Sequence, residues 1–282
     1  MRTVRSSLAT VALVAIAFGI VAPLAHAGAR ALTIKGSDTM VILGQRWAEE
    51  YMNAYPASTI QVTGGGSGVG IAALINGTTD ICAASRPMND DEKLKLRDRY
   101  QTMGTEIPVA KDGLTVYVHE ENSVKELTVA QLRDIYTGKL TNWSQVGGRD
   151  ATITLYGREN SSGTYVFFKD NVLLGNDFSA RCQTLPGTAS VVNAVAKDSR
   201  GIGYGGAAYA KGVRDCGLKK DAAAPAVLPT LETVENGSYP LSRNLFFYTR
   251  TKPAGETKSF IDWVLSDAGQ KIVSDVGYFP VR

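Results

Sequence analysis

The sequence predicts an α/β protein with mainly parallel sheets, organised as two domains. Short runs rich in β-branched and aromatic residues alternate along the chain with amphipathic helical runs, which is the pattern of strands connected by helices. The chain that follows an N-terminal apolar segment is about 250 residues long, enough for two domains of roughly 100 to 200 residues. No tandem repeat, low-complexity tract or long linker occurs in it, so we expect two lobes built from interwoven, discontinuous segments.

Six short runs predict strands, and the first connection between them has a clear helical pattern. The predicted strands are 32–35, 60–62, 81–83, 114–118, 153–156 and 245–248. Between the first two, Leu43, Trp47, Tyr51 and Ala54 recur at three- and four-residue spacing. This spacing predicts a helix whose apolar stripe packs on a sheet, with the tryptophan and tyrosine in the core.

Two later segments carry further helix signals. Thr128 and Gln131 have the spacing of a capping box that opens a helix continuing through Ile135. A final helical segment is predicted over 258–273, with large apolar residues on one face and Gly269 as the position where it breaks.

Residues 1–27 have the three parts of a secretory signal peptide. Two arginines give a charged start, an apolar run covers 8–22, and residues 25–27 form a small-x-small cleavage site. The apolar run is shorter than the roughly 20 residues of a membrane span, and no cysteine follows the cleavage site that could carry a lipid. We therefore expect a periplasmic or secreted protein beginning near Gly28. Removing the signal lowers the net charge from +3 to +1, which argues against a nucleic-acid or polybasic membrane surface.

Cysteine and histidine usage limit the kinds of site the chain can form. Cys82 lies in an apolar strand-like run, whereas Cys182 and Cys216 lie in polar, loop-like surroundings. In an oxidising compartment we expect a disulfide between Cys182 and Cys216, with Cys82 as a buried thiol. No Cys-x-x-Cys pair indicates a zinc site, and His119 is the one histidine outside the signal, so we expect no metal centre.

Three places share one local pattern, a strand followed by a turn rich in Gly, Ser and Thr and then a helix. They are 36–40 (Gly-Ser-Asp-Thr-Met), 64–70 (Gly-Gly-Gly-Ser-Gly-Val-Gly) and 157–164 (Gly-Arg-Glu-Asn-Ser-Ser-Gly-Thr). The first backbone N–H groups of a helix have no internal partner, and the helix dipole places about half a positive charge there. Glycine lets the backbone approach a ligand closely, and hydroxyl groups add donors. One such turn is common, because Ser and Thr cap ordinary helices. Three of them, together with Arg158, can enclose a tetrahedral dianion and hydrogen-bond each oxygen.

Nucleotide motifs are absent from these turns. None has the Gly-x-Gly-x-x-Gly register of a dinucleotide site or the Gly-Lys-Ser/Thr ending of a P-loop. We therefore expect no cofactor.

These segments resemble the phosphate-binding proteins of bacterial phosphate ABC transporters. The similar segments are 36–40, 66–68, Arg158 with 162–164, and, in the same order and spacing, 80–85 and 137–143. The resemblance implies a type II periplasmic binding protein fold, with two α/β lobes, mixed sheets and a hinged cleft that holds the ligand. It places lobe 1 at 29–116 and 246–282, and lobe 2 at 117–245.

The resemblance also implies which residues contact phosphate. Carried over by position, these are Thr39, Ser67, Arg158, Ser162, Gly163 and Thr164, together with Ser37 and Asp38, which the alignment places less directly. There is one departure, because the best-studied branch of the family has an aspartate after the Ala-Ser pair and this chain has Arg86.

This departure bears on selectivity between phosphate and sulfate. Hydrogen phosphate carries a proton and sulfate does not, so a buried carboxylate accepts the first and repels the second. Asp38 is our candidate for this acceptor, and the alternative is that it only caps its helix. Arg86 is either a second cationic clamp on the ligand, a partner that keeps Asp38 ionised, or a fully exposed side chain.

The expected function is a phosphate receptor without catalysis, acting as a monomer that delivers phosphate to an ABC transporter permease in the inner membrane. A receptor for sulfate, molybdate or another oxyanion on the same fold is the alternative. A secreted phosphoesterase using Ser162 or Ser67 would need a base, and His119, followed by two glutamates, has the sequence of a surface turn. An adhesion or sensor module that uses the same cleft is a fourth hypothesis.

Overall fold

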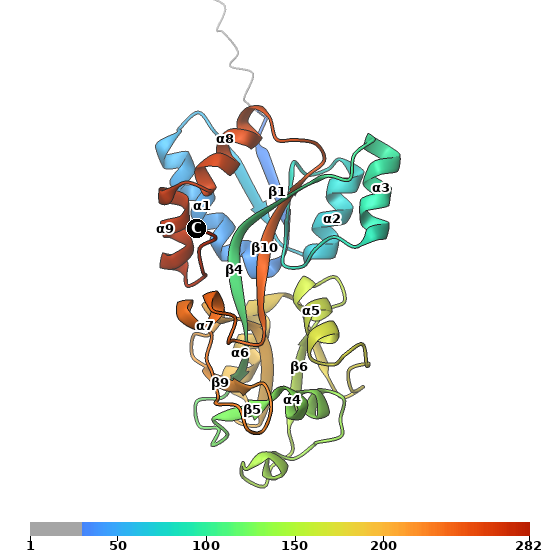
Figure 1. Cartoon of the computed structure of the whole chain (residues 1–282), viewed down its shortest axis with the longest axis vertical. Helices are drawn as coiled ribbons and strands as arrows, with labels where there is room; N and C mark the ends of the chain where they lie inside the picture. Colours follow the sequence, from blue (N-terminus) through green and yellow to red (C-terminus); the bar gives the residue numbers. More distant parts are fainter. Residues whose placement is uncertain (1–29) are drawn as a thin grey trace, which may run out of the picture.

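The computed structural model describes residues 30–282, which form two lobes stacked along the longest axis of the molecule (Figure 1). The predicted signal peptide, 1–27, lies outside the described residues. Within 30–282, no helix combines the length and the apolar character that crossing a bilayer requires.

Lobe 1, the upper lobe in Figure 1, is built from both ends of the described chain. Its elements are β1 (Leu32–Gly36), η1 (Asp38–Met40), α1 (Val41–Ala54), β2 (Ile60–Thr63), α2 (Ser67–Asn76), β3 (Ile81–Ala84), α3 (Asp90–Tyr100), α8 (Gly255–Val264) and α9 (Asp267–Val276). The predicted stripe of α1 is confirmed for Leu43, Trp47 and Tyr51, which are buried in the core of this lobe, whereas Ala54 at the end of the helix is exposed.

Lobe 2, the lower lobe, is built from the middle of the chain. Its elements are β5 (Glu126–Thr128), α4 (Val129–Tyr136), η2 (Trp143–Val146), β6 (Thr154–Arg158), α5 (Gly163–Asn171), β7 (Gln183–Leu185), α6 (Gly187–Lys197), β8 (Gly201–Gly206), η3 (Ala207–Tyr209), β9 (Arg214–Lys219) and α7 (Leu231–Glu235). The predicted capping box is present at α4, where Thr128 accepts a hydrogen bond from Gln131 N and the Gln131 side chain accepts one from Thr128 N.

Two long strands pass through both lobes and join them. They are β4 (Thr105–Val118) and β10 (Ser242–Thr249), which pair antiparallel with each other. The strands form one ten-stranded sheet with the order β2-β1-β3-β10-β4-β8-β6-β7, and β9 and β5 continue from β4. The predicted α/β fold with mixed sheets is confirmed. The strand pairs that involve neither β4 nor β10 are parallel, and every pair that involves β4 or β10 is antiparallel.

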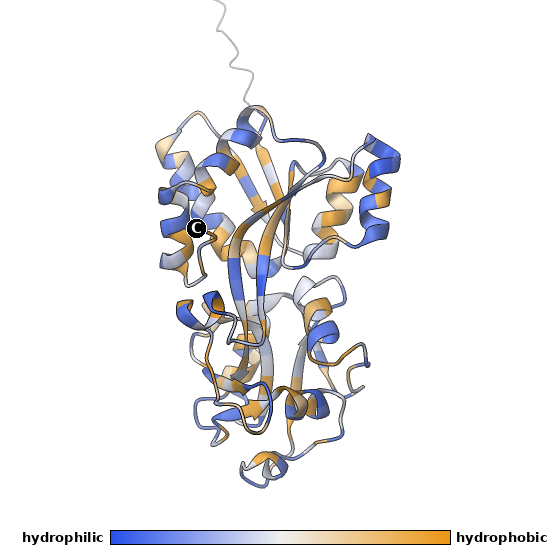
Figure 2. Ribbon diagram, in the orientation of Figure 1, coloured by the Kyte–Doolittle hydropathy of each residue, from blue (hydrophilic) through white to orange (hydrophobic). Residues whose placement is uncertain are grey.

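The hydrophobic core changes from one lobe to the other along these two strands. On β4, Ala110 packs in the lobe 1 cluster and Leu114 in the lobe 2 cluster. Likewise, Leu245 of β10 packs in the lobe 1 cluster, and Leu241, just before β10, packs in the lobe 2 cluster. Between these positions both strands are hydrophilic, as the blue segments in Figure 2 show. The predicted lobe boundaries near 116 and 245 stay predictions, and the core clusters change slightly before each of them.

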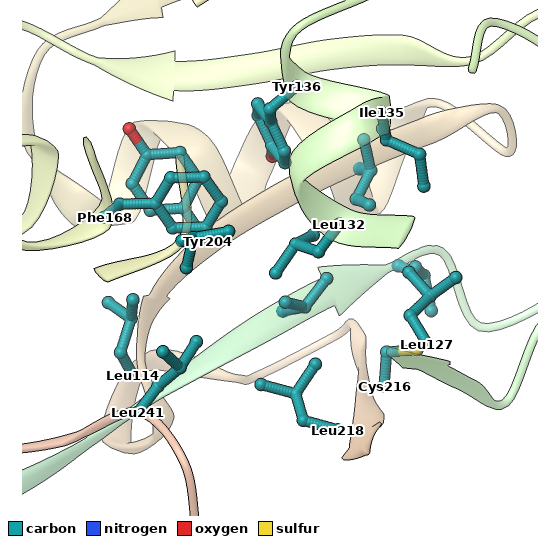
Figure 3. Packing of buried hydrophobic residues seen from close by; sticks show 14 of the residues in the cluster. Leu114, Leu127, Leu132, Ile135, Tyr136, Phe168, Tyr204, Cys216, Leu218 and Leu241 are labelled. Carbon is teal, nitrogen blue, oxygen red and sulfur yellow. The ribbon is translucent and has the colours of Figure 1, made fainter. Parts of the chain in front are cut away.

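The core of lobe 2 is formed by one face of α4 against the sheet and by stacked aromatic rings. Leu132, Ile135 and Tyr136 of α4 are buried in this core (Figure 3), and the Tyr136 ring packs edge-on against Phe168 and Tyr204. The rings of Phe168 and Tyr204 stack with centroids 3.9 Å apart. Each fully buried side chain of this kind contributes roughly 1.5–3 kcal/mol through removal of apolar surface from water, so α5 and β8, which carry these rings, are firmly held behind the cleft.

The C-terminal prediction of one segment broken at Gly269 is wrong in its position. The break lies at Leu265 and Ser266, where Ser266 caps α9 by accepting a hydrogen bond from Gly269 N. Gly269 is inside α9, and a Cβ there would lie 2.3 Å from Val264 O. The glycine therefore permits close packing of α9 on the end of α8 and does not interrupt the helix.

The predicted disulfide is also wrong. All three cysteines are free thiols. Cys216 is fully buried in β9, where it packs near Leu127 (Figure 3), and Cys182 lies before β7 beside Gly157. The sequence around Cys216 is polar, but the strand turns its side chain into the core of lobe 2. Cys82, predicted to be buried, is fully buried.

Candidate anion-binding site between the lobes

The lobe 1 wall of the cleft is formed where three parallel strands end. Ser37 and Thr39 follow β1, Ser67 follows β2, and Ser85 follows β3, and all four are at most 3% exposed. Because the carboxyl ends of parallel strands meet at one edge of a sheet, these hydroxyls converge. Ser37 Oγ donates to Ser85 Oγ at 2.8 Å, and Ser85 Oγ lies 3.3 Å from Ser67 Oγ.

The lobe 2 wall is formed by the end of β6 and the start of α5. Arg158 is the last residue of β6 and is 2% exposed, and its Nη1 donates to Thr188 Oγ1 of α6 at 2.9 Å. Ser162 caps α5, because its Oγ accepts from Thr164 N at 3.2 Å and from Tyr165 N at 3.3 Å. The hydroxyl therefore uses its lone pairs for the helix and keeps its O–H to donate.

The two walls meet through direct polar contacts. Thr39 Oγ1 lies 3.0 Å from Thr164 Oγ1, and Gly68 N donates to Ser161 O at 2.9 Å. Lobe 1 and lobe 2 thus touch through the same segments that the sequence singled out. All three predicted turns come together at this one place.

Two glycines make this close approach possible. Gly66 has φ 96°, and a Cβ on it would lie 2.5 Å from Ser161 O of the opposite lobe. A Cβ on Gly163 would lie 2.4 Å from Ser67 Oγ and 2.7 Å from Ser85 Oγ. A larger residue at either position would hold the lobes apart.

Asp38 belongs to this contact, and its cap alternative is wrong. Its Oδ1 accepts from Gly65 N and its Oδ2 from Arg158 Nη2, both at 2.8 Å, whereas the N-cap of η1 is Ser37. The Arg158 side chain is 1% exposed and that of Asp38 is 15% exposed. The carboxylate is therefore held at the cleft by one donor from each lobe.

Arg86 is neither exposed nor paired with Asp38, so both of these expectations are wrong. Its side chain is 13% exposed, and its Nη1 and Nη2 donate to the two carboxylate oxygens of Glu92 at 2.8 and 2.7 Å. Burial raises the pKa of Glu92, but the hydrogen bonds from Arg86 and Asn89 N outweigh this and hold the pKa below its usual value. Arg86 lines a cavity of about 450 Å³ together with Phe167 of α5, at the edge of the cleft. Its contact with a ligand stays a prediction.

Sequence reasoning missed a third arginine in the cleft. Arg243 of β10 pairs with Asp112 of β4, and its Nη2 also reaches Thr39 Oγ1 and Thr164 Oγ1. Both residues are buried, at 8% and 1% exposure. The available signal was a charged residue two positions before the predicted strand 245–248, and no role was predicted for it.

The charges of the cleft are balanced pair by pair. Arg86 pairs with Glu92, Arg158 with Asp38, and Arg243 with Asp112, and Arg158 Nε also lies 3.8 Å from Glu159 Oε2. An anion held here is therefore stabilised by hydrogen-bond donors and helix N-termini more than by an excess of positive charge.

Among residues 30–282, neither a metal-binding cluster nor a histidine base is found at this cleft. Over residues 30–282, no group of three or more His, Cys, Asp or Glu side chains converges as a metal site. His119 follows the lobe 2 end of β4, and its Nδ1 accepts from Glu121 N at 3.1 Å within a turn. It is not placed to act as a base for Ser162 or Ser67.

A family model described as PBP superfamily domain matches residues 23–268 of the chain. The chain is similar to the phosphate-binding protein PstS of Pseudomonas aeruginosa, with 35% identity over 89% of this chain and 83% of that protein. It is also similar to PstS of Staphylococcus epidermidis, with 36% identity over 86% of this chain and 77% of that protein.

Solved structures resemble the fold over nearly its whole described length. A Clostridium perfringens protein solved with bound phosphate matches with a TM-score of 0.81 and 32% identity, covering 89% of this chain and all of that one. An ABC-type phosphate transport receptor from Vibrio cholerae matches with a TM-score of 0.70 and 29% identity, covering 88% of this chain and 99% of that one.

Proposed function

Because this chain belongs to the family of phosphate-binding proteins PstS, within the PBP superfamily, we propose that it captures inorganic phosphate between its lobes and delivers it to an ABC transporter. The observation that carries the proposal is the buried polar cluster between the lobes. Hydroxyls of Thr39, Ser67 and Ser162, the start of α5 and the guanidinium of Arg158 share this one place. They supply the donors that a desolvated tetrahedral dianion needs.

The proposed ligand contacts are those that the sequence named. They are Ser37, Asp38, Thr39, Ser67, Arg158, Ser162, Gly163 and Thr164, with Arg86 as the outermost member. We expect Arg86 to contribute least, because Glu92 engages both of its terminal nitrogens.

We propose Asp38 as the acceptor of the hydrogen phosphate proton. Each of its carboxylate oxygens accepts one hydrogen bond from the protein, which leaves acceptor capacity on both. An ionised carboxylate in a buried cleft attracts the P–OH group and repels sulfate, which has no proton to give.

Ligand capture is proposed to be a hinge motion of the two lobes about β4 and β10. The two strands are the long connections that run through both lobes, and they are polar where the lobes meet. A ligand that contacts both walls favours the closed arrangement by its contacts there. We place lobe 1 at 29–116 with 246–282 and lobe 2 at 117–245.

The remaining proposals concern location and partner. The signal sequence of residues 1–27 supports export, so that the protein works in the periplasm or outside the cell. The proposed partner is the permease of a phosphate ABC transporter in the inner membrane, and the protein is proposed to act as a monomer without catalysis.

Titration calorimetry on the exported form tests the ligand. We expect binding of one phosphate per chain that equimolar sulfate leaves unchanged. Sulfate binding of equal strength would reject phosphate as the ligand and leave an oxyanion receptor on the same fold.

The Asp38→Asn variant tests the proton acceptor. The amide keeps the shape of the side chain but offers an N–H where hydrogen phosphate presents its own O–H, so phosphate affinity should fall by about tenfold or more while sulfate affinity is unchanged or rises. Asp90→Asn, at an exposed acid of α3, is the matched control and should leave both affinities unchanged. Equal losses for both anions would assign Asp38 a purely structural role.

A further inference from the structure

We infer that Arg243 is a positioning residue of the anion site, which directs the hydroxyls of Thr39 and Thr164 toward the ligand. The inference rests on the proposed phosphate receptor and concerns the same cleft. Arg243 lies outside the three turns and comes from neither wall, because it belongs to crossover strand β10.

Arg243 is held in place by the neighbouring crossover strand. Asp112 of β4 is its direct partner in the register of the two strands. Nε and Nη2 of Arg243 donate to Asp112 Oδ2 at 3.0 and 2.8 Å, and both side chains are at most 4% exposed. A buried guanidinium fixed through two of its nitrogens loses little further freedom when it meets other acceptors.

The same guanidinium contacts one threonine from each lobe. Its Nη2 donates to Thr164 Oγ1 at 2.9 Å and reaches Thr39 Oγ1 at 3.4 Å. A guanidinium can only donate, so each hydroxyl uses a lone pair for Arg243 and turns its O–H elsewhere. The two threonine oxygens lie 3.0 Å apart, so one O–H can serve that contact and the other is free for an anion. A hydroxyl that accepts from a cation is also a stronger donor, because hydrogen bonds in a chain polarise one another.

Two further observations place Arg243 at the ligand cleft as well as in the β4–β10 strand pair. Its guanidinium carbon lies 5.2 Å from the ring centre of Phe167, which lines the cavity at the cleft edge. Its Nη1 is buried and has no acceptor among residues 30–282. Arg243 thus has donor capacity that the described protein leaves unused beside the threonines.

This arrangement links the ligand to the hinge. Thr39 belongs to lobe 1, Thr164 to lobe 2, and Arg243 with Asp112 to the two strands that join the lobes. The hydrogen bonds of Arg243 to both threonines exist together only when the lobes are closed, so the residue favours the closed form that holds the anion.

A double-mutant cycle with phosphate as the probe tests the inference. Arg243→Met removes the donors and keeps much of the side-chain volume, and it should weaken phosphate binding by about tenfold or more. Thr164→Val should also weaken it. If Arg243 acts through the threonine hydroxyl, adding Arg243→Met to Thr164→Val should cause a much smaller additional loss, of about threefold or less. Arg243→Lys, which keeps a donating cation, should restore part of the affinity.

The matched control is Arg250→Met. Arg250 follows β10 on the same chain segment and contacts Asp80 and Thr79 O in lobe 1, away from the cleft threonines. Its replacement should leave phosphate affinity unchanged. The Asp112→Asn/Arg243→Met double variant leaves no unpaired buried carboxylate, so it tests binding even if Arg243→Met alone does not fold.

The outcomes separate the inference from the proposed function. If the unmodified protein does not bind phosphate by calorimetry, the proposed function fails and the inference with it. If the unmodified protein binds and folded Arg243 variants bind equally well, or if the losses of Arg243→Met and Thr164→Val add in full, the inference alone is wrong.

Discussion

Arg158 Nη2 donates to Asp38 Oδ2 at 2.8 Å, and the two residues come from opposite lobes, 120 positions apart in the chain. The pair is a buried ionic contact between the lobes, with Arg158 at 1% and Asp38 at 15% side-chain exposure. It therefore holds the two walls of the cleft in register.

The first prediction concerns this pair. Arg158→Met leaves Asp38 without its charge partner and removes donors from the cleft, so phosphate binding should fall at least about tenfold. The free energy of unfolding should drop by about 3 kcal/mol, because loss of one member of a buried ion pair leaves an uncompensated charge. Calorimetry and urea unfolding measure the two effects.

Arg97→Met is the control for Arg158. Arg97 pairs with Asp98 on the surface of α3, with both side chains more than half exposed, and such pairs contribute about 0–1 kcal/mol. Phosphate affinity of Arg158→Met equal to that of the unmodified protein would contradict the assigned site.

The second prediction concerns Gly163. A Cβ at this position would overlap Ser67 Oγ and Ser85 Oγ of the other lobe, so Gly163→Ala should hinder closure and weaken phosphate binding. The lobes each keep their own core, so thermal unfolding should change much less than affinity. Small-angle scattering with phosphate should show less compaction than for the unmodified protein.

Gly217→Ala is the matched control for Gly163. Gly217 lies in β9, where a Cβ would contact Ala226 Cβ at 3.2 Å within lobe 2. It should have no effect on phosphate affinity. Full closure and unchanged phosphate affinity in Gly163→Ala would contradict this prediction, because they would show that the lobes can close around an added methyl group.

The third prediction concerns pH and Glu92. The pKa of Glu92 in the folded protein lies below its usual value, since Arg86 and Asn89 N outweigh the effect of burial. The group therefore stabilises the fold above its ordinary pKa, and this contribution is lost as pH falls through the lower, folded-state pKa. The stability difference between the unmodified protein and Glu92→Gln should thus be larger at pH 7 than at pH 3. Chemical unfolding at both pH values measures it, with exposed Asp91→Asn as control. A difference that grows toward acid would contradict the Arg86–Glu92 pairing.

The fourth prediction concerns the cysteines. Burial raises the pKa of Cys182 and of Cys216, each to about 12, so both thiols stay protonated and react slowly at pH 8 in the folded protein. A colorimetric thiol reagent should find all three cysteines free once the exported protein is unfolded without reductant. If the reagent detects only one free thiol under these conditions, Cys182 and Cys216 form a disulfide after all.

Much of the fold could be predicted from the sequence, because local patterns determine it. The stripe of α1, the capping box at Thr128 and six of the strands follow from the spacing of neighbouring residues, whereas β5, β7, β8 and β9 were not predicted. The three turns were recognisable for the same reason, since each contains its glycine, hydroxyl residues and helix start in consecutive positions.

The remaining features depend on contacts between distant segments. Arg86 pairs with Glu92 only because α3 begins where it does, and Arg243 meets Asp112 through a strand register that joins positions 131 apart. The side chain of Cys216 enters the core because β9 pairs with both β4 and β5, while its sequence neighbours are polar. Single-sequence patterns contain no information about such pairings, so the third arginine of the cleft, Arg243, was missed and a disulfide was expected.

Every guanidinium group of the cleft is matched by at least one carboxylate, and this has a kinetic consequence. With no surplus charge at its entrance, the protein exerts little long-range pull on a dissolved ion, and added salt has little field to screen. Association rates should therefore vary only weakly with ionic strength. A receptor with such a cleft should bind its ligand at similar rates in dilute water and in a saline medium.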